Sequence, residues 1–374
     1  MDLSKTHVVH VVRQYSPNIG GLEDFVANLT ARQFGRFASV KVITLDRLFR
    51  DPATVLPHHV EINGVEVHRI PFHGSSRYPI APSILRELDG ADLVHVHAVD
   101  FFFDALAITR FWHRKPLVAT THGGFFHTKN DAMLKKIWFN TLTRFSARQY
   151  RQIACCSESD LQQFARIAPK RVSLIENGVD LKKFENASAK TPARHLVTLG
   201  RMSRNKRLDR VLDVLACLNS GDQGWNLDII GAESDLTVLD LERMITERSL
   251  EGKVSVHTGL DDEGVTAVIG NASLFVSASE YEGFGIALIE AMSAGLIPIV
   301  HPNEAFQAFA QRHEEIALAD YSKPDEAAET IHCCFDKMTA GQTLRENVER
   351  ASSAYGWSIA AERYDELYAR ALAQ

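Results

Sequence analysis

Two glutamates, Glu282 and Glu290, stand eight residues apart in the stretch SEYEGFGIALIEAMSAGLIPIV, residues 279–300, which is otherwise mostly apolar or small. A carboxylate in a segment with the composition of a buried core is costly unless its oxygens are paired. Vicinal hydroxyls such as those of a ribose would pair both oxygens of Glu290, and Glu282 can accept hydrogen bonds from other hydroxyls. The alternative is that Glu282 caps the following helix and Glu290 pairs with a basic residue.

The loop between the two glutamates has the features of a ligand-binding turn. Gly285 stands at the start of the helix expected for GIALIEAMSAG, and Gly295 stands just past its end. The backbone N–H groups of Gly283, Phe284 and Gly285 would lack partners without a ligand or a cap. Because glycine has no side chain, a ligand can approach this backbone closely.

Two cations, Arg201 and Lys206, follow the first strand of the second half in the stretch LGRMSRNKRLDRVLDVL. The pyrophosphate of a sugar nucleotide gains negative charge as its glycosidic bond breaks. Fixed cations beside it stabilise the transition state more than the ground state, and this difference accelerates the reaction. The alternative is a solvated basic surface with no ligand.

Gly20 and Gly21 join an expected strand, HVVHVV, to a helix expected from about Leu22 to Phe34. The loop lacks the G-x-G-x-x-G fingerprint of dinucleotide-binding proteins, but a glycine loop at a helix N-terminus still suits an anionic group. Glu23 is interpreted as an ordinary first-turn carboxylate of this helix.

Histidines stand at the ends of two further strands. His122 ends the strand of VATTHGGFF, where a lone histidine is commonly structural, although the following glycines favour a functional role. His95 and His97 lie on one face of the strand in VHVHAVD, as two metal ligands would, but we expect no metal because no third ligand is evident nearby. The chain also contains no Asp-x-Asp, H-E-x-x-H or P-loop motif.

Short β-branched runs alternate with helical patterns along the chain, which predicts parallel sheets covered by helices on both faces. A polar joint near residues 190–194 separates two such series. The expected fold is therefore α/β, with two Rossmann-like domains facing each other across a cleft and ligands at the carboxyl ends of the strands. The expected domains are residues 1–188 and 189–352, followed by a closing helix at 353–374.

The stretch EGFGIALIEAMSAG closely resembles the glutamate-x7-glutamate signature of retaining GT-B glycosyltransferases, family four in the usual classification. The resemblance implies that the first glutamate and the loop amides hold the donor sugar, that the second glutamate holds the nucleotide ribose, and that Arg201 and Lys206 bind the pyrophosphate. Arg207 stands where the family's GR…KG.D pattern has glycine, so the conformation of that turn is open. The resemblance also places the Gly20-Gly21 loop near the donor phosphate or the acceptor, and His122 beside the donor sugar. The resulting catalytic residues are His122, Arg201, Lys206 and Glu282, and the donor-binding residues are Gly20, Gly21, Arg201, Lys206, Glu282, Gly283, Phe284, Gly285 and Glu290.

Within this family the chain looks most like bacterial exopolysaccharide mannosyltransferases of the xanthan and acetan type. These transfer mannose from GDP-mannose to a cellobiosyl diphosphate-polyprenol, with retention of anomeric configuration. The resemblance therefore implies a sugar-nucleotide donor, a lipid-linked oligosaccharide acceptor, and catalysis without a metal or other cofactor. The departing phosphate would help to deprotonate the acceptor hydroxyl.

The composition sets broader limits. The 374 residues carry a formal net charge of −6, which predicts no general attraction to nucleic acid. The five cysteines include no C-x-x-C pair, which favours a reducing compartment. The first residues do not have the pattern of a signal peptide, and no apolar run is long enough to span a bilayer. These features predict a cytoplasmic protein.

Residues 134–151, LKKIWFNTLTRFSARQYR, combine lysines and arginines with aromatic residues at nearly helical spacing. A basic amphipathic helix of this kind can lie on a membrane surface, so we expect a peripheral protein on the inner face of the plasma membrane. The alternative is a domain helix that buries its apolar stripe.

Three other functions compete with a GDP-mannose-dependent transferase. One is a glycosyltransferase that uses a UDP-sugar and another acceptor, and another is a catalytically silent subunit of a polysaccharide assembly complex. The third is a nicotinamide oxidoreductase, which the missing dinucleotide fingerprint disfavours.

Overall fold

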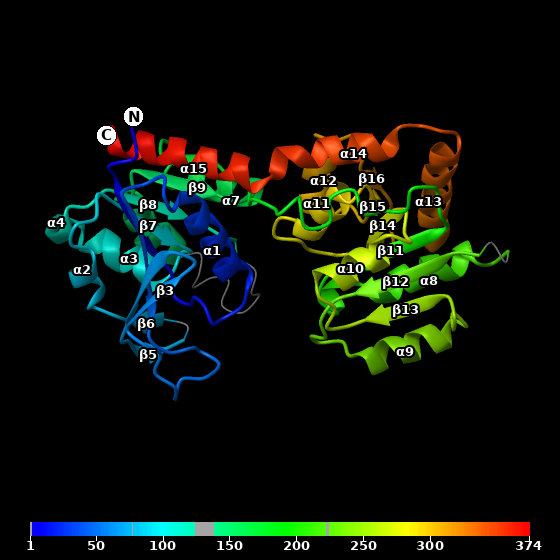
Figure 1. Ribbon diagram of the computed structural model, residues 1–374, viewed down its shortest axis with the longest axis horizontal. Helices are drawn as coiled ribbons and strands as arrows, with labels where there is room; N and C mark the ends of the chain where they lie inside the picture. Colours follow the sequence, from blue (N-terminus) through cyan, green and yellow to red (C-terminus); the bar gives the residue numbers. More distant parts are fainter. Residues whose placement is uncertain (1, 77, 124–137, 222–223) are drawn as a thin grey trace. The chain divides into compact units, whose positions relative to one another are not determined.

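The computed structural model describes residues 2–76, 78–123, 138–221 and 224–374 (Figure 1). The chain forms two compact units. The first unit comprises Met1–Gly178 together with Trp357–Gln374, and the second comprises Val179–Gly356.

The first unit is built on an eight-stranded sheet with strand order β10-β9-β8-β7-β1-β2-β4-β3. Every neighbouring pair is parallel except β3 and β4. The central strands β1, β7 and β8 are almost wholly buried and contain several valines, as expected of a parallel sheet covered on both faces. Their bounds are β1 (His7–Val11), β2 (Ser39–Leu45), β3 (His59–Ile62), β4 (Val65–Ile70), β7 (Leu93–His97), β8 (Leu117–Thr120), β9 (Gln152–Cys155) and β10 (Val172–Leu174).

The antiparallel edge strand β3 departs from the expected parallel arrangement. It is joined to β4 by Asn63 and Gly64, which both have positive φ, 52° and 81°. Asn-Gly with this backbone is the favoured two-residue hairpin turn, so these residues reverse the chain locally. A second small hairpin pairs β5 (His73–Ser75) with β6 (Tyr78–Ile80).

Helices complete the first unit. The last of them, α15 (Trp357–Leu372), packs against α1, β8 and β9, as Figure 1 shows, and buries Tyr364, Leu367 and Tyr368. The helix at the C-terminus of the chain therefore forms part of the core of the first unit. The other helices are α1 (Gly21–Gln33), α2 (Ile84–Glu87), α3 (Phe101–Ile108), α4 (Arg110–His113), the π-helical turn Phe139–Thr143, α6 (Arg144–Ala147) and α7 (Glu158–Ala165).

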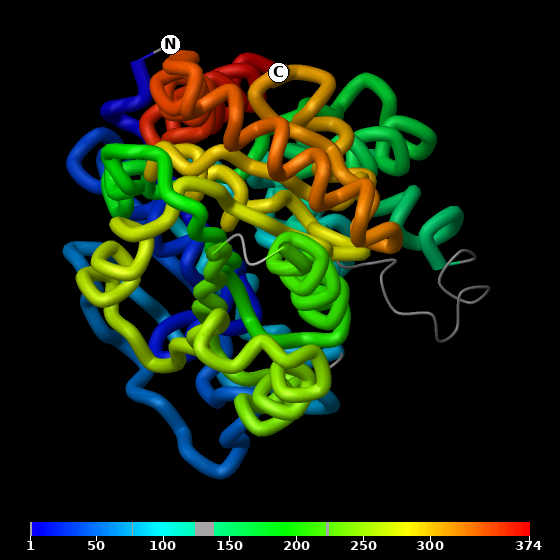
Figure 2. The backbone as a smooth tube through the Cα atoms, turned by 90° about the vertical axis from the view of Figure 1, so that its right-hand side faces the viewer, coloured from blue at the N-terminus to red at the C-terminus, as the bar shows by residue number. Residues whose placement is uncertain are grey.

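The second unit contains a six-stranded parallel sheet with strand order β13-β12-β11-β14-β15-β16. Helices cover it, and α13 lies beside α8, as the backbone trace in Figure 2 also shows. The strands are β11 (His195–Leu199), β12 (Asn226–Ile230), β13 (Val254–His257), β14 (Leu274–Ser277), β15 (Ile297–Val300) and β16 (Ala317–Leu318). The helices are the 3-10 turn Arg204–Lys206, α8 (Leu208–Leu218), α9 (Val238–Glu247), α10 (Asp262–Ile269), α11 (Ile286–Ser293), α12 (Glu304–Ala310), α13 (Pro324–Thr339), α14 (Leu344–Ser352) and the 3-10 turn Ser353–Tyr355.

The units divide at Gly178, ten residues before the boundary expected at 188 (188 − 178 = 10). The reason is that the connecting segment bonds to the second unit: the N–H groups of Asn186 and Ser188 donate to the carbonyls of Ser293 and Ala294. At the other end the second unit continues to Gly356 rather than 352. Tyr355 holds that end through a 2.6 Å hydrogen bond between its hydroxyl and Nε2 of His313.

The basic amphipathic segment expected at 134–151 is described only from Trp138 onward; Lys135 and Lys136 lie outside the described residues. In the described part, the π-helical turn and α6 bury Phe139, Thr143, Ser146 and Ala147. Trp138, Arg144, Phe145 and Arg148 are exposed. Within the parts of the chain that the structure covers, no helix combines the length and apolar character needed to cross a bilayer.

Candidate functional site in the second unit

Arg201 and Lys206 lie in the loop between β11 and α8, at the carboxyl end of a central strand of the sheet. Ligands of doubly wound folds bind at this edge. Arg201 is exposed and makes no hydrogen bond or ion pair with another described residue. Lys206 is half-buried, and its Nζ donates to Oε1 of Glu282 at 2.7 Å. One of the two predicted cations is therefore unpaired, and the other is held by a carboxylate.

Arg207, which replaces the glycine of the family pattern, adopts the left-handed conformation with φ 47° and ψ 48°. Glycine favours this region and other residues occupy it at some cost, so the turn keeps the shape that a glycine would give it. The guanidinium lies against two carboxylates: Nη2 is 2.8 Å from Asp209 Oδ2, and Nη1 is 2.5 Å from Glu280 Oε1. These ion pairs offset the strain.

A second loop, between β14 and α11, carries Glu282 and is tied directly to the first. The side chain of Asn205 donates to the carbonyl of Tyr281 at 2.8 Å, and the N–H of Glu280 donates to the carbonyl of Asn205 at 3.0 Å. These two hydrogen bonds, together with the Lys206–Glu282 pair, hold the two loops against each other. Lys206 and Glu282 are therefore held together by the contacts between the two loops.

The start of α11 is left open. Its N-cap is Gly285, whose φ of 96° and ψ of 42° suit glycine, and no side chain caps the helix. The backbone N–H groups of Gly283, Phe284 and Gly285 donate to no other described residue. Phe284 is buried against Phe309, with ring centroids 5.3 Å apart, and anchors the loop. The open N–H groups offer an anion or a hydroxyl oxygen a ready set of donors.

Glu290 lies in the middle of α11 and is largely buried. Burial raises the pKa of its carboxyl, and Lys183 opposes that rise. The Nζ of Lys183 is 3.9 Å from Glu290 Oε1 but only 3.0 Å from Asp262 Oδ1. The structure therefore gives different answers for the two structural alternatives, a helix cap for Glu282 and a basic partner for Glu290. Glu282 does not cap the helix, and Glu290 has a basic neighbour that binds another carboxylate more closely.

Candidate residues in the first unit

Gly20 and Gly21 begin α1 as expected. Gly20 is the extended N-cap residue, and a Cβ added there would lie 2.6 Å from Oε2 of Glu23. Around Gly21 there is open space. Glu23 turns back toward the loop, where its Oε1 accepts a 2.7 Å hydrogen bond from Asn18. Glycine at position 20 thus leaves room for the carboxylate of Glu23. Besides standing in the first turn of α1, this carboxylate binds the side chain of Asn18.

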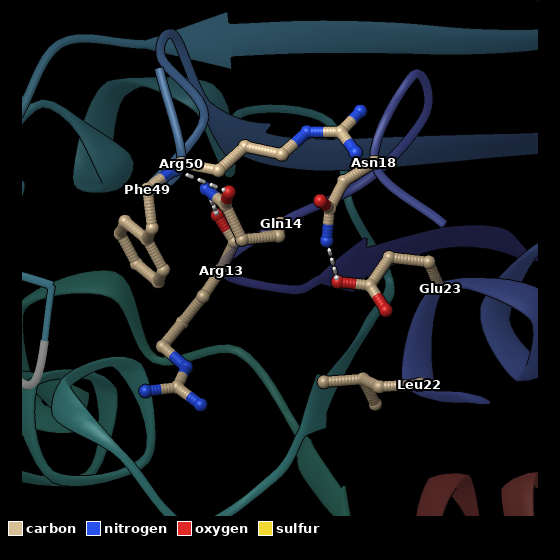
Figure 3. Close-up of a pocket in the computed structure, with 7 residues that line it drawn as sticks. All are labelled: Arg13, Gln14, Asn18, Leu22, Glu23, Phe49 and Arg50. Atoms are coloured by element: carbon tan, nitrogen blue, oxygen red, sulfur yellow. Dashed lines mark hydrogen bonds between the residues drawn. The ribbon is translucent and has the colours of Figure 1, made fainter. Parts of the chain in front are cut away.

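A cavity of about 250 Å³ opens beside this loop at the carboxyl ends of β1 and β2 (Figure 3). Gln14 organises its wall, because its Nε2 donates to the carbonyls of Arg13 and Arg47 while its Oε1 accepts from the N–H of Phe49. The lining is mixed: two cations, one carboxylate, two amides and two apolar side chains. Its members are Arg13, Gln14, Asn18, Leu22, Glu23, Phe49 and Arg50.

His122 follows β8 and has a left-handed backbone, φ 56°. Its Nε2 lies 3.1 Å from Nδ1 of His97, and Phe25 packs edge-on against its ring at 4.5 Å. Burial lowers the pKa of His122 to about 3. Of the two glycines that follow it, Gly123 donates its N–H to Asp160 Oδ2 at 3.1 Å, and Gly124 lies outside the described residues.

The expectation that His95 and His97 have no third candidate ligand nearby is wrong, because His10 lies beside them. His10 on β1 stands in register with His95 on the neighbouring strand β7, and Nδ1 of His10 lies 2.9 Å from Nε2 of His97. The signal was present in the sequence, because HVVHVV and LVHVH are both buried-strand patterns with histidines that can share one sheet face. Finding it required knowing that β1 and β7 are neighbours.

The structure therefore gathers the predicted residues in two places. Arg201, Lys206, Glu282, the Gly283–Gly285 loop and Glu290 all lie in the second unit, on the loops after β11 and β14 and on α11. Gly20, Gly21 and His122 lie in the first unit, at the carboxyl ends of β1 and β8.

Comparison with known proteins decides the family. Residues 19–183 match the model of Glycosyltransferase Family 4, and residues 180–351 match that of Glycosyl transferases group 1. A GDP-mannose:cellobiosyl-diphosphopolyprenol alpha-mannosyltransferase from Xanthomonas campestris is 41% identical over 368 residues, 98% of this chain and 97% of the relative. The chain belongs to the group 1 glycosyltransferases.

Two further similarities extend this finding. The protein of the same name from Komagataeibacter xylinus is 39% identical to this group 1 glycosyltransferase over 370 residues, 98% of this chain and 93% of the relative. The structure of Anabaena HepE in complex with UDP superposes with a TM-score of 0.74 at 17% identity, covering 97% of this chain and 99% of the other. That likeness concerns the fold alone, and it agrees with the predicted GT-B architecture of two Rossmann-like domains.

Proposed function

We propose that this glycosyltransferase transfers mannose from GDP-mannose to cellobiosyl-diphosphopolyprenol, forming an α-mannosidic bond with retention of configuration. The observation that carries the reaction class is the arrangement of Arg201 and the Lys206–Glu282 pair beside three open backbone N–H groups. The donor and acceptor rest on relatives that are 39% and 41% identical over 98% of the chain and whose names state this activity.

In this proposal the diphosphate of the donor lies at Arg201 and Lys206. Charge grows on the diphosphate as the glycosidic bond breaks, and these two cations are already in place when it does. Because Lys206 is already held by Glu282, it needs little reorganisation at the moment of reaction, while Arg201, unpaired among the described residues, can follow the diphosphate. Glu282 orients Lys206 through the 2.7 Å hydrogen bond and offers its second oxygen to a hydroxyl of the sugar.

Glu290 holds the ribose in the same proposal. A buried carboxylate with one distant basic neighbour has unused acceptor capacity, and two vicinal hydroxyls would fill it. Replacing Glu290 with glutamine keeps the shape and removes the charge. We expect Glu290→Gln to weaken GDP binding by about tenfold, since hydrogen bonds to charged groups contribute on the order of 1.5–3 kcal/mol. Unchanged GDP affinity by calorimetry would contradict the ribose assignment.

Catalysis is proposed to need no metal or other cofactor, because Arg201 and Lys206 supply the positive charge with which a divalent ion would otherwise neutralise the diphosphate. Mannosyl transfer by the purified protein is expected to persist at full rate in excess chelator. A loss of rate that Mg²⁺ or Mn²⁺ restores would overturn this part of the proposal.

The direct test of function is a donor and acceptor panel. Purified protein is incubated with GDP-mannose or UDP-sugars and with cellobiosyl-diphosphopolyprenol, and the linkage of the product is determined by NMR. Mannosylation from GDP-mannose alone is expected. Transfer from a UDP-sugar instead would favour the alternative donor, and tight nucleotide binding without any transfer would favour a silent subunit.

Nucleotide preference can be measured separately from turnover. A ligand that binds only the folded state raises its stability by RT ln(1 + [L]/Kd), so GDP is expected to raise the melting temperature more than UDP at equal concentration. The intact Arg201, Lys206, Glu282 and Glu290 favour an active enzyme over a silent subunit.

We further propose that the first unit rests on the inner face of the plasma membrane through the surface formed by α4 and residues 138–151. Ile108, Phe111 and Trp112 are exposed, with 64% and 67% of the two aromatic residues accessible. Helix α3 packs against both α4 and α6, so the two segments adjoin. Aromatic side chains beside cations suit the interface of an anionic bilayer. The cations in and next to these two segments are Arg110, Arg114, Lys115, Arg144, Arg148 and Arg151.

Liposome cosedimentation tests this surface. Phe111→Ser with Trp112→Ser is expected to reduce binding to anionic vesicles at least tenfold. Leu239→Ser on α9, another exposed apolar side chain, serves as the control and should leave binding unchanged. Equal vesicle binding by all variants would show that α4 and residues 138–151 form an ordinary domain surface.

A further inference from the structure

A row of hydrogen-bonded side chains crosses the interior of the first unit from α1 to the end of β8. Oε1 of Gln33 lies 2.8 Å from Nε2 of His10, and Nδ1 of His10 lies 2.9 Å from Nε2 of His97. Nδ1 of His97 then lies 3.1 Å from Nε2 of His122. Gln33, His10 and His97 are wholly buried or nearly so. Each bond uses opposite ends of successive imidazoles, so the row is continuous.

The row fixes where each proton sits. A neutral imidazole has one N–H donor and one acceptor nitrogen. Because Oε1 of Gln33 only accepts, His10 must carry its proton on Nε2, which leaves Nδ1 to accept from His97. The same reasoning places the proton of His97 on Nε2 and then the proton of His122 on Nε2. The Nδ1 of His122 is left with a lone pair.

The histidines are held neutral by their surroundings. Burial lowers the pKa of His10 to about 4 and that of His122 to about 3, and it lowers the pKa of His97 well below its ordinary value. Neutral side chains are the condition for the alternation of donor and acceptor along the row. A charged imidazole would donate from both nitrogens and break it.

The phenol of Tyr368 on α15 lies near the amide of Gln33. Burial raises the pKa of Tyr368 and Gln33 opposes that rise, but Nε2 of Gln33 makes no hydrogen bond with a described residue. The Tyr368 hydroxyl lies 2.6 Å from Nδ1 of His95, whose Nε2 lies 2.7 Å from Oγ1 of Thr120. The orientation of the Gln33 amide therefore rests on the 2.8 Å contact between its Oε1 and Nε2 of His10.

The same histidines could be mistaken for a metal centre, because donor nitrogens of His10, His95 and His97 lie within 4.8 Å of one another. The 2.9 Å separation of His10 and His97 is a hydrogen-bond length. Two imidazoles on one tetrahedral zinc, each at about 2.0–2.1 Å, would hold their nitrogens roughly 3.3–3.4 Å apart. Both nitrogens of all three rings are also already paired.

We propose that Gln33 is a positioning residue that sets the tautomer of His122 through His10 and His97, so that His122 presents Nδ1 as a hydrogen-bond acceptor to a hydroxyl of the donor sugar. The ligand of Nδ1 rests on the proposed function, whereas the tautomer itself does not. With the opposite tautomer His122 would present an N–H and could not accept from that hydroxyl.

The tautomer is read directly from long-range proton–nitrogen correlation spectra of protein labelled with ¹⁵N-histidine, with the His122 signals assigned by His122→Asn. An unprotonated Nδ1 and a protonated Nε2 are expected for His122. In Gln33→Met, which keeps the length of the side chain but has no amide, His10 loses its acceptor. An unpaired buried N–H is less tolerable than an unpaired lone pair, so the row should reverse and the proton should appear on Nδ1 of His122.

Two companion variants sharpen the test. Gln33→Glu keeps an acceptor toward His10 and should restore the wild-type pattern. Tyr368→Phe keeps the ring and removes the hydroxyl that lies near the Gln33 amide and bonds His95, so it should give a mixture of tautomers, and it serves also if Gln33→Met fails to fold. A protonated Nδ1 in the wild-type protein, or a pattern unchanged in both Gln33→Met and Tyr368→Phe, would overturn the proposal.

Kinetics then connect the tautomer to the substrate. Gln33→Met is expected to raise the KM for GDP-mannose about tenfold while GDP affinity stays unchanged, and Gln33→Glu should recover the KM. A reversed tautomer with an unchanged KM would refute the contact with the donor sugar. Absence of any transfer from GDP-mannose in the wild-type protein would refute the proposed function and leave the spectroscopic result standing.

Discussion

At the scale of single residues, the chemistry assigned to this glycosyltransferase depends on cations whose surroundings differ. Arg201 is exposed and unpaired among the described residues, whereas Lys206 is held by Glu282. A free guanidinium can follow a diphosphate, and a restrained ammonium is already directed. The two should therefore contribute to the same step by different routes.

Removing either cation is expected to slow transfer strongly. Arg201→Ala or Lys206→Ala should lower kcat by on the order of 10²-fold or more, because a fixed charge that stabilises the developing diphosphate is lost. The measurement is mannosyl transfer at saturating donor. Arg243→Ala, an exposed arginine on α9 paired with Asp240, is the matched control and should leave kcat unchanged. Near-normal turnover in either site variant would contradict the role assigned to that residue.

Asp100 offers a test that depends on pH. It is buried, accepts a hydrogen bond from the N–H of Phe102, and lies 2.9 Å from Nε of Arg13. Burial raises its pKa to about 6, with Arg13 opposing the rise. A raised pKa in the folded state gives stability that is complete below the ordinary value of 3.8 and is lost as the pH rises through about 6.

Asp100→Asn removes this titration and keeps an acceptor for the helix cap. Between pH 5 and pH 7 the wild-type protein should lose on the order of 1 kcal/mol of unfolding free energy relative to the variant. Urea denaturation of both proteins at the two pH values measures the difference. A constant difference, or one of opposite sign, would show that Asp100 does not titrate as inferred.

At the scale of elements, the loop before α11 combines openness with a demanding backbone. Gly285 has φ 96°, and a Cβ there would lie 3.2 Å from a ring carbon of Phe306. Gly283 lacks both constraints, because its nearest neighbour for a Cβ is the Tyr281 hydroxyl at 4.0 Å. The two glycines therefore have different roles: Gly285 allows the backbone conformation of the turn, and Gly283 leaves space beside it.

Alanine substitutions at the two positions should distinguish these two roles. Gly285→Ala is expected to destabilise the fold by roughly 1–3 kcal/mol, the usual cost of a strained backbone position. Gly283→Ala should leave the melting temperature nearly unchanged. Thermal unfolding without ligand provides the comparison, and equal melting temperatures for the two variants would refute the distinction.

Most elements could be predicted because their signals are local. The valine-rich runs and the glycines around α11 correspond to the observed strands and helix bounds. The edge strand β3 is not predicted, because it is short and half-exposed. The partners of a side chain were harder to foresee. Glu282 accepts a hydrogen bond from Lys206, 76 residues away, and His10 contacts His97 on the neighbouring strand. Such contacts depend on strand order, which no local pattern contains.

At the scale of the whole molecule, the chain forms two units with separate cores, and the nucleotide-binding residues proposed here lie in the second. Trp357 belongs to the first, where its ring lies 5.2 Å from that of Phe25 and 5.2 Å from the guanidinium of Arg32. A side chain added at Gly178 would lie 2.4 Å from this ring. The beginning of α15 is thus closely packed.

Trp357→Ala should destabilise the first unit by about 3–5 kcal/mol, the usual cost of removing a buried aromatic side chain. Because the second unit keeps its own core, GDP should bind the variant with unchanged affinity. Calorimetric unfolding with and without GDP is the measurement. If GDP binding is lost when the first unit unfolds, nucleotide binding does not depend on the second unit alone.

The place of α15 has a consequence for how the protein is made. The ribosome completes β1 to β10 before residues 179–356, and α15, which packs its own Tyr364 and Tyr368 against the first unit, is synthesised after both. Residues 179–356 have everything they need for their own core before that moment. Since domains generally fold as units during synthesis, the amino-terminal sheet should wait, partly uncovered, while the later-made portion folds ahead of it.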